Sequence, residues 1–201
     1  MAETPLWARL GGWRISRHPV VRRIYGRLDQ VGIVLAQLDR FERTTVESPT
    51  DDPALPDGVE LTGVSLADGL PDTLDAAPVA PEDRLLLARR ADTTVGWCLL
   101  SARPVYVPEL HRRLSFDGAY LWRLYVTPNE RGQGIGSALV MRAIQEAATA
   151  LNETQINALV APDNLPSRRA FANAGFTPIE RFTSVGYRDW RYDRREQLTT
   201  R

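Results

Sequence analysis

The sequence contains no lysine, a single cysteine and no long apolar run. A lone cysteine cannot form an internal disulfide, and Cys98 has no Cys or His neighbour with which to bind a metal, so no metal is expected. Its apolar surroundings favour a small core residue over a nucleophile. No stretch approaches the roughly 20 apolar residues of a membrane span. The N-terminus lacks the apolar core and cleavage site of a secretory signal, so we expect a cytoplasmic protein without a transmembrane segment.

A length of 201 residues, with 43% apolar and 25% charged residues, is typical of one globular domain with an appendage. The net charge of zero hides an uneven distribution, because residues 44–83 hold ten acids and no base while both flanking regions are rich in arginine. The acidic stretch could attract a cationic amine, although a solvated surface is the simpler interpretation. No clear basic patch follows the N-terminal region, so no nucleic-acid partner is expected.

Residues 1–57 are predicted to lie outside the main domain. Their apolar residues recur among arginines at loosely helical spacing, which predicts an amphipathic helical extension, with a short strand or second helix near residues 31–35. Residues 47–58 are acidic and rich in proline, as in a linker. The extension could bind a membrane surface or a partner, but covering the domain's own core is the simpler role.

Residues 58–201 mix strand-like and helix-like segments and form the predicted main domain. The expected elements are a strand at 59–64, a polar helical region to about 81, hairpin strands at 84–90 and 94–102, an irregular loop at 103–118, a strand at 119–126, a helix at 135–151, a strand at 155–160, a short helix at 167–174 and strands from 176 onward.

The most informative segment is a glycine loop between a predicted strand and helix. Gly132, Gly134 and Gly136 carry no Cβ, so a bulky anion can approach the backbone N–H groups at the positive end of the helix. Arg131 can add a charge-assisted contact, and Ser137 can donate its hydroxyl. The loop is therefore predicted to bind a pyrophosphate.

Other glycine loops fit less well. The Walker A motif needs a lysine, which this sequence lacks. In a dinucleotide fingerprint the third glycine would fall at Ser137, and Glu153 would precede the next strand instead of ending it. A dinucleotide-binding domain and a structural turn without a ligand remain as alternatives.

Two motifs in sequence resemble those of the GCN5-related N-acetyltransferases. They are Val126-x-Pro-x-x-Arg-Gly-x-Gly-x-Gly-x-x-Leu139 and Asn164-x-x-Ser167-x-x-x-Phe171-x-x-x-Gly-Phe176. The resemblance is close over residues 119–176, looser from 59 to the end, and absent over 1–57. It implies an α+β fold: a mixed, mostly antiparallel sheet, flanked by helices, whose central strands splay apart in a V that admits the cofactor.

The resemblance also implies a site for acetyl-CoA. The backbone of Leu124, Tyr125 and Val126 would pair with the pantetheine arm, and the Val126 amide would bind the acetyl carbonyl oxygen. The other side of the arm would meet Asn164, Ser167 and Phe171. The pyrophosphate would meet the amides of Arg131, Gly132, Gln133, Gly134, Ile135, Gly136 and Ser137.

The sequence departs from the family pattern at the positions of the general acid and the general base. Phe171 stands where the family often has a tyrosine that protonates the leaving thiolate, and phenylalanine has no proton to give. The acidic base of some members would fall at Tyr120 or Trp122. Tyr120 and Val126 are our catalytic candidates, although lining the pocket with its aromatic ring is the simpler role for Tyr120. Further candidates for the base are Glu109, His111, Asp117 and Asp163.

The resemblance implies an N-acetyltransferase that moves an acetyl group from acetyl-CoA to a primary amine by direct attack. The acceptor could be a small amine, an amino sugar, or the N-terminus or a lysine of a protein. The alternative is a catalytically weak acetyl-CoA-binding regulatory module. A homodimer is one assembly that the protein could form.

Overall fold

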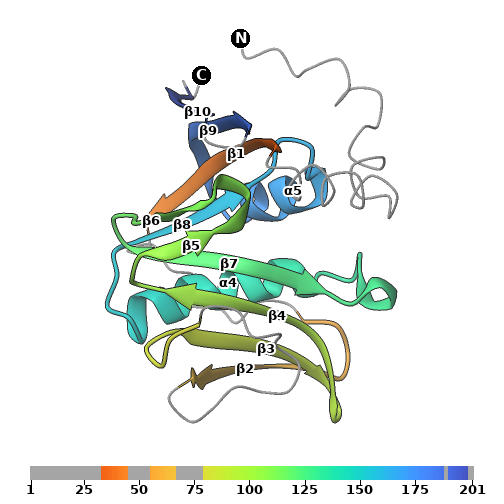
Figure 1. Cartoon of the computed structure of the whole chain (residues 1–201). Helices are drawn as coiled ribbons and strands as arrows, with labels where there is room; N and C mark the ends of the chain where they lie inside the picture. Colours follow the sequence, from red (N-terminus) through yellow and green to blue (C-terminus); the bar gives the residue numbers. More distant parts are fainter. Residues whose placement is uncertain (1–32, 45–54, 67–78, 188–189, 199–201) are drawn as a thin grey trace.

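The computed structural model describes residues 33–44, 55–66, 79–187 and 190–198, with side chains from Leu35 onward. Eight strands form one sheet in the order β10-β9-β1-β8-β7-β4-β3-β2, and β5 and β6 form a separate hairpin (Figure 1). The strands are β1 Ile33–Thr44, β2 Val59–Ser65, β3 Arg84–Arg90, β4 Thr93–Ser101, β5 Val105–Val107, β6 Arg112–Leu114, β7 Ala119–Val126, β8 Gln155–Val160, β9 Thr177–Tyr187 and β10 Trp190–Gln197. The helices are α4 Ile135–Thr149 and α5 Leu165–Asn173, with short 3₁₀ turns η2 Pro108–Leu110 and η3 Pro128–Glu130.

All neighbouring strands of the large sheet are antiparallel except β7 and β8, which run parallel. The expected α+β fold with a mostly antiparallel sheet is therefore confirmed. The predicted strands and helices after residue 58 lie within a few residues of their observed bounds, apart from the polar helical region, most of which falls outside the described residues.

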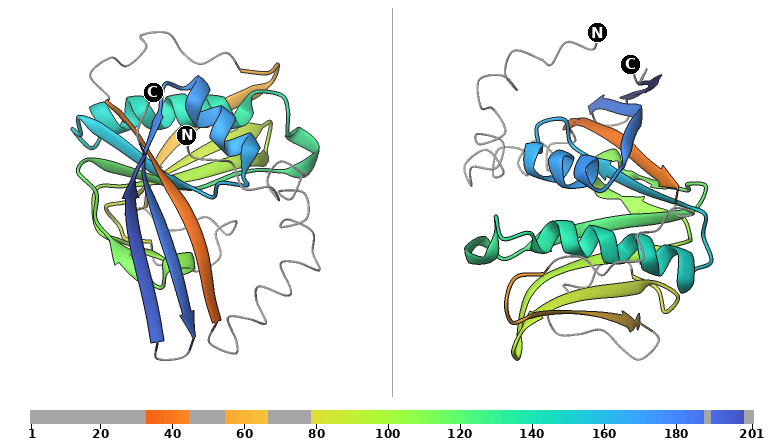
Figure 2. Two further views of the ribbon diagram at one scale, coloured as in Figure 1. Left: turned by 90° about the horizontal axis from the view of Figure 1, so that it is seen from above. Right: turned by 180° about the vertical axis from the view of Figure 1, so that it is seen from behind.

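Helices α4 and α5 lie on one side of the sheet, as the view from behind shows (Figure 2, right). The apolar stripe of α4, which includes Leu139 and Ile144, packs on leucines of β3 and β4 in the main core. Cys98 belongs to this core and is fully buried, and burial raises the pKa of its thiol, so it is a core residue as expected. The opposite side of the sheet carries a second apolar cluster around Leu99, Tyr120 and Trp122.

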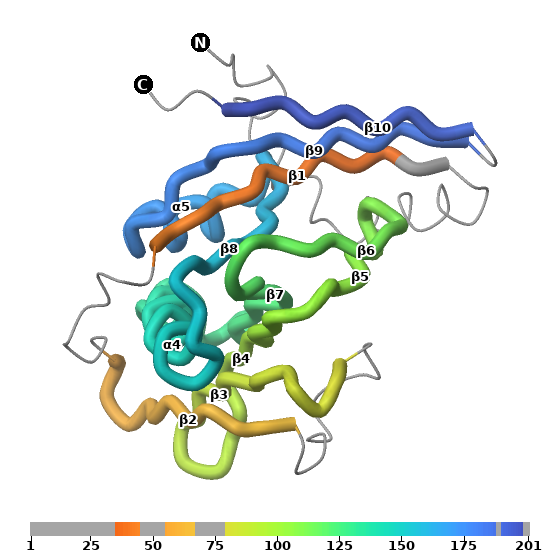
Figure 3. The backbone as a smooth tube through the Cα atoms, turned by 90° about the vertical axis from the view of Figure 1, so that its left-hand side faces the viewer, coloured from red at the N-terminus to blue at the C-terminus, as the bar shows by residue number. Residues whose placement is uncertain are grey.

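Strand β1 corrects the predicted domain boundary. Residues 33–44 form an interior strand that pairs with β8 on one edge and β9 on the other, as the tube view shows (Figure 3). They belong to the main sheet and not to an N-terminal extension. The apolar residues of this segment, which include Leu35, Leu38 and Phe41, recur at helical spacing without strand alternation, so the sequence pattern was misleading. The rest of the predicted helical extension, residues 1–32, and most of the predicted linker at residues 47–58 lie outside the described part of the chain.

The central strands part after a short contact. Strands β7 and β8 pair only from Ala119 to Leu121, opposite Ile156 to Ala158. Along β7, residues 119–122 are buried, whereas residues 123–126 are exposed or half-buried because no strand covers that edge. We call the space beside residues 123–126, on the side of β7 away from β4, the gap. The strands diverge toward the loop that precedes α4 (Figure 1).

Candidate functional site

Strand β7 contains a β-bulge where it leaves β8. Trp97 of β4 pairs with Tyr125, but Leu99 pairs with Trp122, so β7 has one residue more than β4 over this step. Arg123 lies within the bulge and adopts a left-handed conformation with a φ of 54°. Such bulges bend a strand and re-aim its backbone groups. Here the bulge follows directly after the last pair with β8.

The bulge leaves two backbone N–H groups facing the gap. The N–H of Thr127 donates to the Val95 carbonyl of β4 at 2.9 Å, so the backbone groups of the preceding residue, Val126, point away from β4. Trp97 and Leu99 lie two residues apart on β4, so the backbone groups of their partners, Tyr125 and Trp122, both face β4. The trans peptide after Trp122 therefore turns the N–H of Arg123 toward the gap. The family resemblance implied the Val126 N–H as a donor. Nothing in the sequence predicted the Arg123 N–H, since no residue type at that position indicates a bulge.

The glycine loop is open toward solvent. Gly132 and Gly134 have φ values of 80° and 90°, which favour glycine, and a Cβ on either would meet no atom within 4 Å. The positive φ values therefore favour glycine at both positions, and no protein atom occupies the space where a side chain would begin. Gly136 differs, because a Cβ there would make an ordinary contact with Val126 Cγ2 at 3.7 Å.

Helix α4 begins without a side-chain cap. Its N-cap residue is Gly134, and its first turn holds no acid. In contrast, Asn164 caps α5 by accepting the N–H of Ser167 at 3.4 Å. The first-turn N–H groups of α4 therefore lack a side-chain acceptor among the described residues, at the end of a helix that favours anions.

Two arginines flank the loop. Arg131 donates through Nε to the Val126 carbonyl at 2.9 Å and lies 5.7 Å from the centre of the Tyr125 ring. Arg90 of β3 donates hydrogen bonds to two side chains of the loop, to Glu130 at 2.9 Å and to Gln133 at 3.2 Å. The Arg90 contacts tie the loop to the sheet, while Arg131 occupies a backbone acceptor of the gap.

The predicted residues of α5 divide between the gap and the core. The Asn164 side-chain oxygen is used in capping, which leaves its NH₂ group to donate, and Ser167 is half-buried beside it. Phe171 is 3% exposed and packs against Phe41 and Phe176, with ring centres 6.2 and 5.0 Å away. This packing makes Phe171 a core residue and does not support its contact with the pantetheine arm.

Tyr120 and Trp122 share the sheet face opposite the helices. Tyr120 is 7% exposed and lies against Phe116, with ring centres 4.9 Å apart. Burial raises the pKa of Tyr120, and the charge of Glu109 raises it further, so the phenol keeps its proton near neutral pH. Trp122 donates through Nε1 to Ser101 Oγ at 2.8 Å. These contacts favour aromatic lining over a catalytic base at Tyr120.

Of the other candidates for a base, Glu109 and His111 are exposed around η2, and Asp163 is half-buried before α5. Asp117 lies in the loop before β7 and lines a hollow of about 230 Å³ on the face opposite the helices. We call this the Asp117 hollow. Its remaining lining residues are Arg40, Leu114, Ser115, Phe116, Glu180, Phe182 and Arg195.

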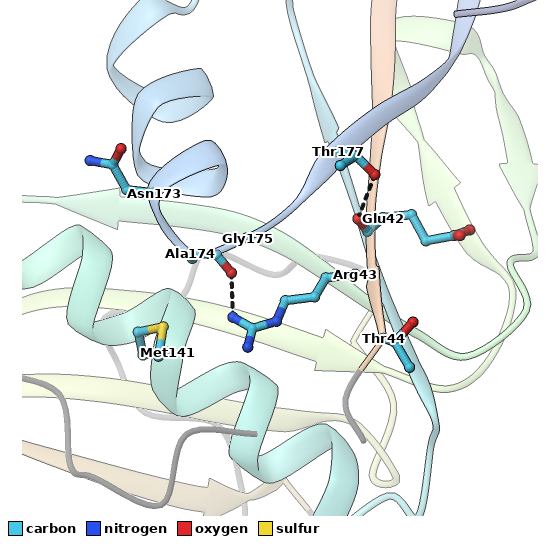
Figure 4. Close-up of a pocket in the computed structure, with 8 residues that line it drawn as sticks. All are labelled: Glu42, Arg43, Thr44, Met141, Asn173, Ala174, Gly175 and Thr177. Carbon is cyan, nitrogen blue, oxygen red and sulfur yellow. Dashed lines mark hydrogen bonds between the residues drawn. The ribbon is translucent and has the colours of Figure 1, made fainter. Parts of the chain in front are cut away.

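A larger hollow, of about 540 Å³, lies elsewhere. It is bounded by the ends of β1 and α5, and Arg43 within it donates to the Ala174 carbonyl (Figure 4). Its β1 residues pair with the start of β8, and β8 runs parallel to β7. The larger hollow is therefore at the opposite end of the strands from the glycine loop and contains none of the predicted site residues.

Among the described residues, no group of three or more His, Cys, Asp or Glu side chains could hold a metal ion. No helix in the same part of the chain is long and apolar enough to cross a membrane.

Comparisons with known proteins agree with this geometry. The model of the acetyltransferase (GNAT) family matches residues 60–176. A curated relative, the L-2,4-diaminobutyric acid acetyltransferase of Nocardia farcinica, is 26% identical over 122 residues, which are 55% of this chain and 63% of the relative.

Solved structures show the same fold. A GCN5-related N-acetyltransferase from Kribbella flavida is 17% identical, with a TM-score of 0.55 over 84% of this chain and 64% of its own. One from Sphaerobacter thermophilus is 16% identical, with a TM-score of 0.51 over 88% and 56%. A tandem GNAT protein from the clavulanic acid biosynthesis pathway is 15% identical, with a TM-score of 0.55 over 85% and 58%.

The chain therefore spans less than two thirds of each of these relatives, and identities of 15 to 17% establish the fold alone. The family match is stronger evidence, because residues 60–176 are more than half of the chain and include the gap, the glycine loop and both sequence motifs. On this evidence the chain belongs to the acetyltransferase (GNAT) family.

Proposed function

We propose that this protein transfers an acetyl group from acetyl-CoA to a primary amine. The observation that carries the proposal is the gap beside β7, where backbone donors lie unpaired by β8 and the open glycine loop stands at its mouth. A long ligand with amide groups and a pyrophosphate fits both parts at once. The pantetheine arm of acetyl-CoA has the amide groups, and its nucleotide end has the pyrophosphate.

The donor would bind as an added strand. The pantetheine amides would pair with the backbone of residues 124–126, in the manner of peptides that extend a sheet edge. The pyrophosphate would accept N–H groups of residues 131–137 at the start of α4. Arg131 would exchange its bond to the Val126 carbonyl for the phosphates, which frees that carbonyl for the arm.

The chemistry would be direct attack. The nitrogen of a neutral amine attacks the thioester carbonyl, the C–N bond forms, and negative charge develops on the carbonyl oxygen. The N–H of Val126 or of Arg123 would stabilise that charge, and one such donor contributes about 3 to 4 kcal/mol to lowering the barrier. The C–S bond then breaks, the thiolate leaves, and the proton lost by nitrogen passes to water. Most of the remaining acceleration would come from holding the two reactants together.

The acceptor is proposed to be a small amine. The curated relative is named for L-2,4-diaminobutyric acid, an amino acid with a second amine.

The direct test is release of free thiol from acetyl-CoA with a panel of amines that includes 2,4-diaminobutyrate, simple diamines, an aminoglycoside and a lysine peptide. We expect turnover with at least one small amine. Tight acetyl-CoA binding without turnover on any of them would contradict transferase activity and favour the regulatory module.

A further inference from the structure

The acceptor has to approach from a different direction than the donor. If the pyrophosphate lies at the start of α4, the thioester end of acetyl-CoA points toward the last pair of β7 and β8, formed by Leu121 and Ala158. Helices α4 and α5 cover one face of the sheet (Figure 2). The amine therefore enters from the opposite face, near this last pair.

The Asp117 hollow lies on that face, next to the last pair. Arg40, in its lining, pairs across the strands with Leu159, the first residue of β8 beyond the contact with β7. Phe116, also in the lining, packs on Tyr120 of β7. The hollow therefore adjoins the point where the gap closes, within reach of an acceptor whose amine enters the gap.

Two charged groups of the hollow have partners inside the protein. Arg40 lies 3.5 Å from Glu42 and 3.3 Å from Glu180, and donates to Asn157 Oδ1 at 3.3 Å. The same Asn157 donates through Nδ2 to the Asp117 carbonyl at 2.8 Å. This network fixes the floor of the hollow and the backbone of Asp117, and it leaves Arg40 and Glu180 engaged with each other.

Two other charged groups are available to a ligand. The carboxylate of Asp117 and the guanidinium of Arg195 line the hollow, and neither forms an ion pair or a side-chain hydrogen bond with the described residues. Arg195 lies 5.0 Å from the centre of the Phe182 ring, which holds it over the hollow's apolar wall. One negative and one positive group thus face the same small volume, from the loop before β7 and from β10.

We propose that the Asp117 hollow anchors the zwitterionic head of an amino acid whose side chain carries the amine to be acetylated. Asp117 binds the α-ammonium group and Arg195 binds the α-carboxylate, while the side-chain amine reaches the thioester. The inference rests on the proposed acetyl transfer and names its substrate class. A plain diamine would lack a partner for Arg195, and a plain carboxylate would lack one for Asp117.

The test compares acceptors that differ only by the α-carboxylate. Ornithine is set against putrescine and lysine against cadaverine, with kcat/KM measured for each. We expect each amino acid to exceed its diamine by about tenfold to a hundredfold, since a site built for a charged group discriminates against the analogue that lacks it. Equal use of amino acids and diamines would overturn the proposal.

Variants assign the contacts. Arg195→Gln and Asp117→Asn should each raise KM for ornithine about tenfold or more, and Arg195→Gln should collapse the ratio of ornithine to putrescine. The control for Arg195→Gln is Arg194→Gln, because Arg194 points to the other face of β10 and lies 2.5 Å from Glu196. The control for Asp117→Asn is Asp92→Asn, in the exposed turn between β3 and β4. The proposal fails if the controls change the ratio as much as the hollow variants do.

A binding measurement separates this proposal from the proposed function. Ornithine is titrated by calorimetry into protein saturated with CoA, without any turnover. Binding by the wild type that is lost in Arg195→Gln supports the anchoring site even if no acetyl transfer is seen. Absence of ornithine binding overturns the site even if some other amine is acetylated.

Discussion

The glycines of this chain serve different physical purposes. Gly132 and Gly134 adopt positive φ in open space, whereas Gly118 combines a φ of 85° with a neighbour that leaves no room. A Cβ at Gly118 would lie 2.3 Å from the Gln155 carbonyl oxygen, just before β7 meets β8. The first two glycines leave room for a ligand, and Gly118 allows the two central strands to approach.

Gly118→Ala should therefore destabilise the fold by at least about 2 to 3 kcal/mol, because it adds both backbone strain and a clash with fixed backbone. Gly136→Ala is the matched control, since it lies in a helix with room for a methyl group and should change stability by less than about 1 kcal/mol. Denaturant unfolding of both variants decides the point. Equal stability of the two would contradict the close approach.

Tyr120 provides a prediction about catalysis. Because burial raises the pKa of Tyr120, the phenol stays protonated near neutral pH and cannot serve as a general base. Tyr120→Phe should keep kcat within about threefold and leave the shape of the pH profile unchanged. A loss of about a hundredfold, or a lost limb of the profile, would restore Tyr120 as a proton-transfer residue.

Among the elements, the glycine loop and α4 could be predicted from the sequence because short segments determine them. Glycine spacing fixes the loop, and the apolar repeat of residues 135–147 fixes the helix and its buried face. The β-bulge at Arg123 could not be predicted, since a non-glycine residue adopts the positive φ there. Strand β1 was predicted only as a short strand or second helix near residues 31–35, because its partners, β8 and β9, lie more than a hundred residues away in sequence.

Strand β1 is held by a buried charge. Asp39 is fully buried and accepts Arg168 of α5 at 2.5 Å and Arg181 of β9 at 2.6 Å. It joins the N-terminal strand to the helix whose first turn is proposed to contact the pantetheine arm. Strand β1 is therefore part of the domain that builds the site.

Asp39→Ala should destabilise the protein by about 3 to 5 kcal/mol, because it leaves two arginines at a buried position without their carboxylate. Arg194→Gln serves as the control, since it removes an exposed pair with Glu196 that should contribute less than about 1 kcal/mol. Thermal or denaturant unfolding measures both. If the two variants lose the same stability, β1 is not held in this way.

In the whole molecule, the two halves of the sheet are joined by a contact of three residue pairs between β7 and β8. A ligand that fills the gap contacts both halves and should stabilise the folded state. At a concentration 100 times its Kd, acetyl-CoA would add about 2.7 kcal/mol. We expect Tm to rise with acetyl-CoA concentration, and adenosine alone to give a much smaller rise at the same concentration. An unchanged Tm at saturating acetyl-CoA would contradict binding across the gap.

The central claim is that the glycine loop binds the pyrophosphate of acetyl-CoA, and calorimetry tests it most directly. Acetyl-CoA is titrated into the wild type, into Gly134→Glu, and into Thr149→Glu, which adds the same charge at the far, exposed end of α4. We predict one binding site per chain in the wild type and in Thr149→Glu, and an affinity at least about a hundredfold lower in Gly134→Glu, which must still melt cooperatively. No binding by the wild type, or equal binding by a folded Gly134→Glu, would contradict the account.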